Sequence, residues 1–351
     1  MIEQHFRHRS GRFSPLVVSA FVVALLAGLP IASVGFNLLL GGTSGTWAHL
    51  ASTVLPEYVL NSLALCAGVG LGVAIIGIAT AWLTAMHDFP GRRIFEWALV
   101  LPLAVPAYVM AYVYTDFLQF VGPVQTALRD FFEWRRGDYY FPDIRTLPGA
   151  MLMFVFVLYP YVYLLARTAF LERAGGVLEA SRTLGIGPWR AFFTVSLPLA
   201  RPAIAAGVAL ALMETLADYG TVAYFAVNTF TTGIYRAWFS LGDRIASAQL
   251  AAMLLGFVLL LVAVERITRG RARYHNTSNR HRPPPGRLTG GAGLLAMLTC
   301  LLPLCMGFLL PAALLLRMAL GEGDTQFGER FLVLARNSFT LAGLTALIAV
   351  A

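Results

Sequence analysis

The sequence contains no lysine, and all 26 of its basic residues are arginine. Such a chain has no phosphate-loop lysine, no Schiff-base lysine and no lysine general base, so nucleotide binding through a Walker A motif is excluded. Charged residues make up only 13% of the 351 residues, whereas hydrophobic residues make up 58%. This composition cannot cover a water-soluble surface, and it indicates a protein embedded in a lipid bilayer.

Cysteine and histidine are also scarce, with three and six residues. Cys66, Cys300 and Cys305 stand in apolar stretches without a CxxC pair, so neither a disulfide framework nor a zinc site is predicted. The sequence has no HExxH motif and no GxSxG turn. We therefore expect no catalytic residue, no metal site and no cofactor in this chain.

Long apolar runs are abundant. A membrane-spanning helix needs roughly 20 mostly apolar residues, and the sequence holds seven such runs. They cover residues 15–40, 60–85, 94–118, 148–171, 202–223, 246–264 and 290–316. An eighth run begins near Asn337 and is still apolar at Ala351. The expected fold is all-α, a polytopic helical bundle with several passes through the membrane.

Arginine counts in the loops predict the orientation, because positively charged loops stay in the cytoplasm. With a cytoplasmic N-terminus, the inner segments hold 17 arginines and the outer segments nine. The net charge of +8 is then explained by topology and by attraction to anionic membrane lipid. Nucleic acid is not an expected partner.

The start of the chain recurs after a basic, proline-rich segment. Two pairs of runs correspond, Gly35-Phe36 with Gly307-Phe308 and Asn61–Leu65 with Asn337–Leu341. We predict a first six-span unit over 1–265, a cytoplasmic linker over 266–289 and an incomplete second unit over 290–351, which makes the chain a fragment of a longer fused protein. Chance similarity between apolar helices is the alternative.

The predicted inner segment between the fourth and fifth spans, at about 172–200, has the most specific pattern. Residues 177–184 favour a short helix, Gly185 supplies the left-handed conformation that ends it, and Pro188 suits the first turn of a second helix. The apolar face predicted for that second helix consists of Trp189, Phe192 and Phe193. Such a helix-turn-helix fits a groove on another protein, and the alternative is a hairpin that only joins two spans.

The spacing in this segment resembles the EAA loop of inner-membrane permeases of ABC importers. The usual pattern is Glu-Ala-Ala, three residues, Gly, nine residues, Ile, one residue and Leu-Pro, and Ser181 and Val195 are mild departures from it. In that family the loop docks in a cleft of a cytoplasmic ATPase dimer. The residues to which the resemblance assigns this coupling role are Glu179, Ala180, Ser181, Gly185, Trp189, Leu197 and Pro198.

Other runs resemble the ferric-iron permeases, which are fused proteins with two EAA-bearing halves and a periplasmic iron-binding protein. These runs are Leu101–Tyr108, Leu158–Tyr161, Glu214–Val222 and Phe230–Tyr235. The resemblance implies a type I, MetI-like permease of an ABC importer in the bacterial inner membrane, with a periplasmic binding protein and an ATPase dimer as partners. It favours ferric iron as the substrate, although thiamine or phosphonate permeases share the coupling loop.

Acidic residues inside predicted spans are candidates for a translocation path or gate. Glu214 and Asp218 lie four residues apart and are expected on one helical face, followed by Tyr219, while Asp116 ends the third span. The alternative for Glu214 and Asp218 is a helix-packing hydrogen bond. A different function class, a gradient-driven secondary transporter, would use these two carboxyl groups as a proton or cation relay.

Overall fold

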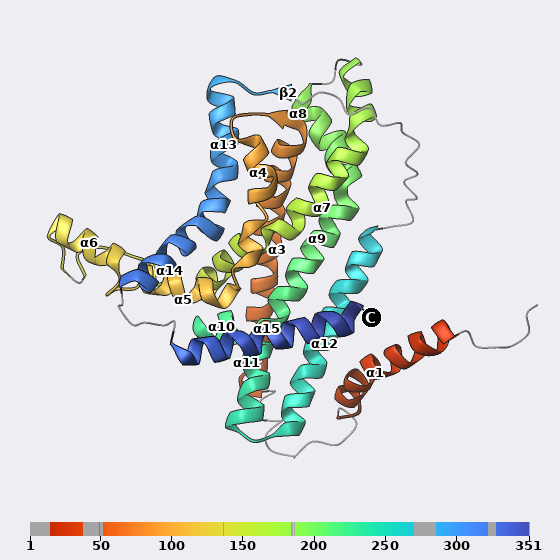
Figure 1. Ribbon diagram of the computed structural model, residues 1–351, viewed down its shortest axis with the longest axis vertical. Helices are drawn as coiled ribbons and strands as arrows, with labels where there is room; N and C mark the ends of the chain where they lie inside the picture. The colour runs from red at the N-terminus through yellow and green to blue at the C-terminus, as the bar shows by residue number, and fades with distance from the viewer. Residues whose placement is uncertain are drawn as a thin grey trace, which may run out of the picture. The chain divides into compact units, whose positions relative to one another are not determined.

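The computed structural model describes residues 15–37, 49, 52–135, 137–183, 185, 187–269, 286–321 and 328–350. These residues are almost entirely helical (Figure 1). Seven helices are long and apolar enough to cross a membrane, or eight if one bent pair counts as a span. The prediction of an all-α, multi-pass bundle is confirmed, while the cytoplasmic N-terminus stays a prediction.

The chain divides into two compact units, Met1–Phe308 and Leu309–Ala351, and each is described by itself. Between residues 15 and 183, the described helices are α1 (Pro15–Asn37), α3 (Leu55–Met86), α4 (Arg92–Ala98), the 3₁₀ turn η1 (Leu101–Ala104), α5 (Ala107–Leu118), α6 (Pro123–Phe132) and α7 (Leu147–Thr183). Next come α8 (Pro188–Ala191), the π-helical η2 (Phe192–Ser196), α9 (Leu197–Ala217), α10 (Gly220–Tyr224), α11 (Phe230–Tyr235), the π-helical η3 (Arg236–Ser240) and α12 (Arg244–Arg269).

After α12, the next described helices are α13 (Gly290–Leu304) and the π-helical η4 (Cys305–Leu309). The second unit holds α14 (Leu310–Gly321) and α15 (Glu329–Val350). Most of the predicted linker, residues 270–285, lies outside the described residues. The division into a unit over 1–265, a linker and a second unit from 290 therefore stays a prediction.

The third predicted span is not the single helix expected over 94–118. The helical segments Arg92–Ala104 and Ala107–Phe132 are bent by 89° relative to each other. Pro106 stands at the bend, and Val105 before it has an extended backbone. The steric clash between a proline ring and the preceding residue disfavours helix at that residue, so the break follows from local chemistry.

Two other span boundaries also differ from the predicted ones. The fifth span covers Trp189–Ala217 instead of 202–223, so the residues after Ala217 fall outside it. The last helix begins at Glu329 and not near Asn337. In both cases the helix starts among polar or charged residues, which hydropathy alone assigns to loops.

Helices α3, α7 and α9 form the centre of the first unit (Figure 1). They approach closely where glycine faces Val162 of α7. A Cβ atom added to Gly77 of α3 would lie 2.6 Å from Val162 Cβ, and one added to Gly207 of α9 would lie 2.7 Å from Val162 Cα. Helices in a bilayer associate through such small residues, because lipid gives no hydrophobic drive for association.

Two short strands connect distant parts of the first unit. Strand β1 (His87–Asp88) pairs in parallel with β2 (Gly286–Arg287), and the Leu288 N–H donates to the Asp88 carbonyl at 2.9 Å. Strand β1 directly follows α3, and β2 shortly precedes α13. The pairing therefore fixes the start of α13 beside the end of α3.

Candidate functional site

The segment with the EAA spacing forms the predicted helix-turn-helix. Helix α7 ends at Thr183, Gly185 has a φ of +74°, and Pro188 begins α8. Glycine adopts this left-handed backbone without the steric cost of a Cβ atom, which explains the turn. One detail was wrong: the first helix is not a short piece over 177–184 but the end of the 37-residue α7.

The apolar side chains of this segment point in two directions. Trp189 and Phe193 are 74% and 60% exposed, whereas Phe192 is only 8% exposed. The Phe192 ring lies 4.7 Å from the ring of Trp82 of α3, centre to centre. The prediction of one apolar face with all three residues was therefore wrong, because residues 192 and 193 are about 100° apart around a helix.

The other predicted coupling residues take different places. Gly185 is exposed, and Leu197 and Pro198 are half-buried in the first turn of α9. Glu179, Ala180 and Ser181 belong to α7, but their side chains lie outside the described part of the structure. The described part thus offers a turn with two exposed aromatic rings, Trp189 and Phe193, at one end of the bundle. We call this end the α8 end.

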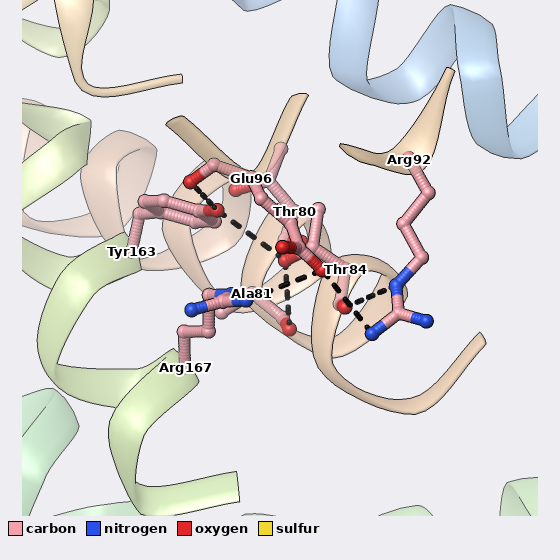
Figure 2. Close-up of polar contacts among 7 residues, drawn as sticks. All are labelled: Thr80, Ala81, Thr84, Arg92, Glu96, Tyr163 and Arg167. Carbon is pink, nitrogen blue, oxygen red and sulfur yellow. Dashed lines mark hydrogen bonds and ion pairs between the residues drawn. The ribbon is translucent and has the colours of Figure 1, made fainter. Parts of the chain in front are cut away.

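A network of charged residues lies among α3, α4 and α7 (Figure 2). Glu96 Oε1 of α4 pairs with Arg92 Nη2 at 3.2 Å and with Arg167 Nη2 of α7 at 3.4 Å. The three side chains are between 20% and 31% exposed. At this burial the attraction is less screened than on an open surface, so the pairs hold α4 against α7.

Hydrogen bonds join the network to the backbone of its neighbours. The Tyr163 hydroxyl of α7 donates to the Glu96 carbonyl at 2.9 Å, and Arg92 Nε donates to the Thr84 carbonyl near the end of α3 at 3.0 Å. Figure 2 shows these bonds to the backbone beside the ion pairs of Glu96. Sequence reasoning missed this network, although Arg92 and Glu96, four residues apart, were a visible sign of an ion pair.

Asp218 has a defined structural role at the opposite end, which we call the α11 end. Helix α9 ends at Ala217, and Asp218 has an extended backbone. Its Oδ1 accepts the Thr221 N–H at 2.8 Å, and its carbonyl accepts the Thr231 hydroxyl at 2.9 Å. Asp218 is the C-cap of α9, and its N–H still donates to the Glu214 carbonyl at 3.1 Å, so the shared face of these two residues stays a prediction.

The remaining candidate path residues come from α5, α9 and the start of α10. Glu214 is exposed on α9, and Asp116 is half-buried in α5. Among the described residues, no hydrogen bond or ion pair links the side chain of either to Asp218. Tyr219 instead stacks on Tyr235, with ring centres 3.8 Å apart. The role of these four residues in a path stays a prediction.

A cavity of about 510 Å³ lies beside the stacked tyrosines. Arg236 lines it and donates to Asn228 Oδ1 at 3.1 Å. Asn228 in turn donates to Glu57 Oε1 at 2.9 Å and accepts, through its carbonyl, from Asn61 at 2.9 Å. The cavity thus has a polar wall tied to the first turns of α3. In the described part of the chain, no three His, Cys, Asp or Glu side chains gather as metal ligands.

Comparison with known proteins places this architecture in a family. Residues 72–273 match the family model described as binding-protein-dependent transport system inner membrane component. The molybdenum transport system permease protein ModB of Escherichia coli K12 is 31% identical over 236 residues, which is 62% of this chain and 97% of ModB. The Fe(3+)-transport system permease protein FbpB 2 of Haemophilus influenzae is 26% identical over 341 residues, which is 94% of this chain and 62% of that protein.

A solved structure has the same fold. It is a bacterial alginate ABC transporter in complex with an alginate-bound periplasmic protein, with a TM-score of 0.58 and 16% identity over 72% of this chain and 95% of that chain. The family match covers more than half of the sequence and includes α7, α8 and α9. It confirms the predictions of an ABC permease and of an inner-membrane location. The chain therefore belongs to the family of inner-membrane components of binding-protein-dependent transport systems, as a permease component of an ABC importer and not as an enzyme.

Proposed function

We propose that this permease imports ferric iron delivered by a periplasmic binding protein, and that residues 172–200 couple it to a cytoplasmic ATPase dimer. The observation that carries the coupling role is the α7–α8 turn with its exposed Trp189 and Phe193. Both rings stand on one side of the helical stretch, four residues apart. Exposed aromatic residues at such spacing are typical of a helix that binds in a groove.

The charge around the turn supports a protein partner more than a lipid one. Arg190 is exposed next to Trp189, and Glu179 precedes the turn in the EAA pattern. An acidic and a basic residue that flank two aromatic rings suit a protein groove with complementary charges. An anionic lipid surface would favour basic residues alone.

Ferric iron is the first candidate substrate because the alignment with a ferric-iron permease extends over most of this chain. FbpB 2 aligns with 94% of this chain, so the likeness includes the residues after α12. A tetrahedral oxyanion is the second candidate, because ModB has a higher identity of 31% over the shorter region that it covers. The sulfate permease CysT of Escherichia coli, 28% identical over 61% of this chain, supports that second candidate.

The experiment is ATP-dependent uptake by the full permease, reconstituted with its ATPase in liposomes. Binding protein loaded with radiolabelled ferric iron is compared with binding protein loaded with molybdate. We expect iron uptake that needs ATP and is absent with a non-hydrolysable analogue. Uptake of molybdate without uptake of iron would replace ferric iron by a tetrahedral oxyanion as the substrate. Uptake that persists without ATP and collapses with an ionophore would overturn the ABC mechanism in favour of a secondary transporter.

A further inference from the structure

We propose that Glu96 is a positioning residue whose carboxylate fixes α4 to α7, so that movement of the α8 end reaches the bent segment between α4 and α5. The inference rests on the proposed coupling role of residues 172–200. It assigns a function to the network in Figure 2, which neither the EAA pattern nor the candidate path residues include.

The first step is the attachment of α4 to α7. Arg167 pairs with the Glu96 carboxylate at 3.4 Å, and the Tyr163 hydroxyl donates to the Glu96 carbonyl at 2.9 Å. Tyr163 and Arg167 are four residues apart, hence on the same face of α7. Two contacts from one helical face to one residue restrain both the position and the rotation of α4.

The second step is the continuous helix from this contact to the coupling segment. Arg167 and Thr183 belong to the same continuous helix. Pro160, the residue most able to kink α7, precedes Tyr163 and Arg167. The portion of α7 that carries both contacts continues to Thr183 without a proline, and Gly175 and Gly176 are the weakest helix formers in it. Movement of the turn at Gly185 therefore reaches Tyr163 and Arg167 along one helix.

The third step leads from α4 to the opposite side of the bend. Helix α4 has only seven residues, and the chain then passes through η1 to the 89° bend at Pro106. Tyr108 in the first turn of α5 lies against Gly220, where an added Cβ atom would come within 3.0 Å of Tyr108 Cβ. Gly220 begins α10, directly after the turn that Asp218 holds. A displacement of α4 thus reaches the α11 end through packed backbone.

The network itself has an unsatisfied group. Arg167 Nε is buried, and no described residue accepts a hydrogen bond from it. A buried donor without a partner is costly, so loss of the Glu96 carboxylate would leave the Arg167 guanidinium with still fewer acceptors.

The test measures whether nucleotide at the ATPase still changes the surroundings of Tyr108. The three native cysteines are replaced by alanine, Tyr108→Cys is introduced, and the full permease with its ATPase is placed in nanodiscs. The labelling rate of Cys at 108 by a water-soluble thiol reagent is compared with and without ATP plus vanadate. We expect at least about a threefold nucleotide effect in this parent and its loss in Glu96→Gln.

Matched variants separate positioning from mere stability. Arg167→Lys keeps the charge opposite Glu96 and should retain the nucleotide effect, whereas Arg167→Met should lose it. The double variant Glu96→Gln/Arg167→Met should be no worse than either single one, as expected for two residues of one interaction. Arg93→Gln, on the exposed side of α4, is the control and should keep the full effect.

Each outcome tests either the role of Glu96 or the proposed coupling function of residues 172–200. A full nucleotide effect in assembled Glu96→Gln complexes would overturn the role of Glu96. If Glu96→Gln does not assemble, the two Arg167 variants decide the question. An equal nucleotide effect on the labelling rate in Arg167→Met and Arg167→Lys would overturn the role of Glu96. Absence of any nucleotide effect in the parent would count against the proposed coupling function itself.

Discussion

The two ends of the first unit hold their polar groups in different ways. At the α8 end, ion pairs join side chains of α4 and α7, which are separated by about 70 residues, for instance Glu96 and Arg167. At the α11 end, several groups bond within local turns: Thr229 and Thr232 form a capping box for α11, and Asp218 accepts the Thr221 N–H. Asn228 adds hydrogen bonds to Glu57 and Asn61 of α3. The α8 end therefore depends on ion pairs between helices, whereas the α11 end combines local turns with hydrogen bonds between helices.

This difference predicts how each end responds to a partner. Capping bonds form within a few residues, so the α11 end keeps its local geometry even when helices move. The ion pairs at the α8 end join side chains of two helices, so α4 is expected to follow a displacement of α7. The α8 end is therefore suited to transmitting a movement, and the turns of the α11 end to keeping one local shape.

Reversal of charge in the coupling segment should have the largest effect. Glu179→Arg is expected to weaken the binding of the ATPase by about 100-fold and to abolish uptake, since a like charge then faces the partner's groove. Insertion into the membrane should be normal. Co-purification of the ATPase through a tag on the permease measures this binding, and Asp130→Arg, at an exposed site on α6 outside the coupling segment, is the control. Normal uptake with an intact complex would show that Glu179 has no coupling role.

Removal of the buried Phe192 ring from the same segment should lower the stability of the protein. Phe192→Ala removes a side chain packed against Trp82, and we expect unfolding to be easier by about 3 kcal/mol. Thermal unfolding in detergent measures this change. Phe193→Ala, at the neighbouring exposed position, should change the free energy of unfolding by less than about 0.5 kcal/mol. Equal losses for both variants would contradict the separation of the two rings.

Loss of the exposed ring should act on binding without a change in stability. Trp189→Ala is expected to cost about 2 kcal/mol of ATPase binding, roughly 30-fold, as for a central aromatic residue of an interface. Titration of the solubilised permease with purified ATPase measures the affinity. Trp97→Ala, which removes another exposed tryptophan from α4, should bind normally. Unchanged affinity in Trp189→Ala would place the ATPase contact elsewhere.

The smallest effect is expected at the α11 end. Asp218→Ala removes the acceptor of the Thr221 N–H and should destabilise this turn by about 1 kcal/mol. Asp218→Asn keeps an acceptor oxygen and should leave stability unchanged. We expect Asp218→Asn to lower uptake, because it removes the negative charge. Normal uptake in that variant would leave Asp218 with its structural role alone, and hydrogen exchange at Thr221 would report the turn independently.

The sequence predicted features that arise from local chemistry. Gly185 and Pro188 define the α7–α8 turn within a few residues, and apolar runs define the spans. The end of α9 at Ala217 was missed because hydropathy stays high across it. Its available sign was Asp218 three residues before Thr221, the spacing of a helix cap.

Features that depend on tertiary contacts were not predictable in this way. Arg167 lies far along the chain from Glu96, and only the packing of α4 on α7 brings them together. The opposite directions of Phe192 and Phe193 likewise follow from where Trp82 of α3 stands. The bend at Pro106 was foreseeable as a kink, but its angle of 89° reflects the arrangement of the helices around it.

The pairing of β1 with β2 has a consequence for biogenesis. Residues His87–Asp88 leave the ribosome early, whereas Gly286–Arg287 are synthesised only after α4 through α12. The hydrogen-bonding edge of β1 therefore stays open while these helices are inserted into the membrane. Closure of the strand pair is a late step, so protection of the Leu288 amide would mark chains in which α4 through α12 have been synthesised and β2 has reached β1.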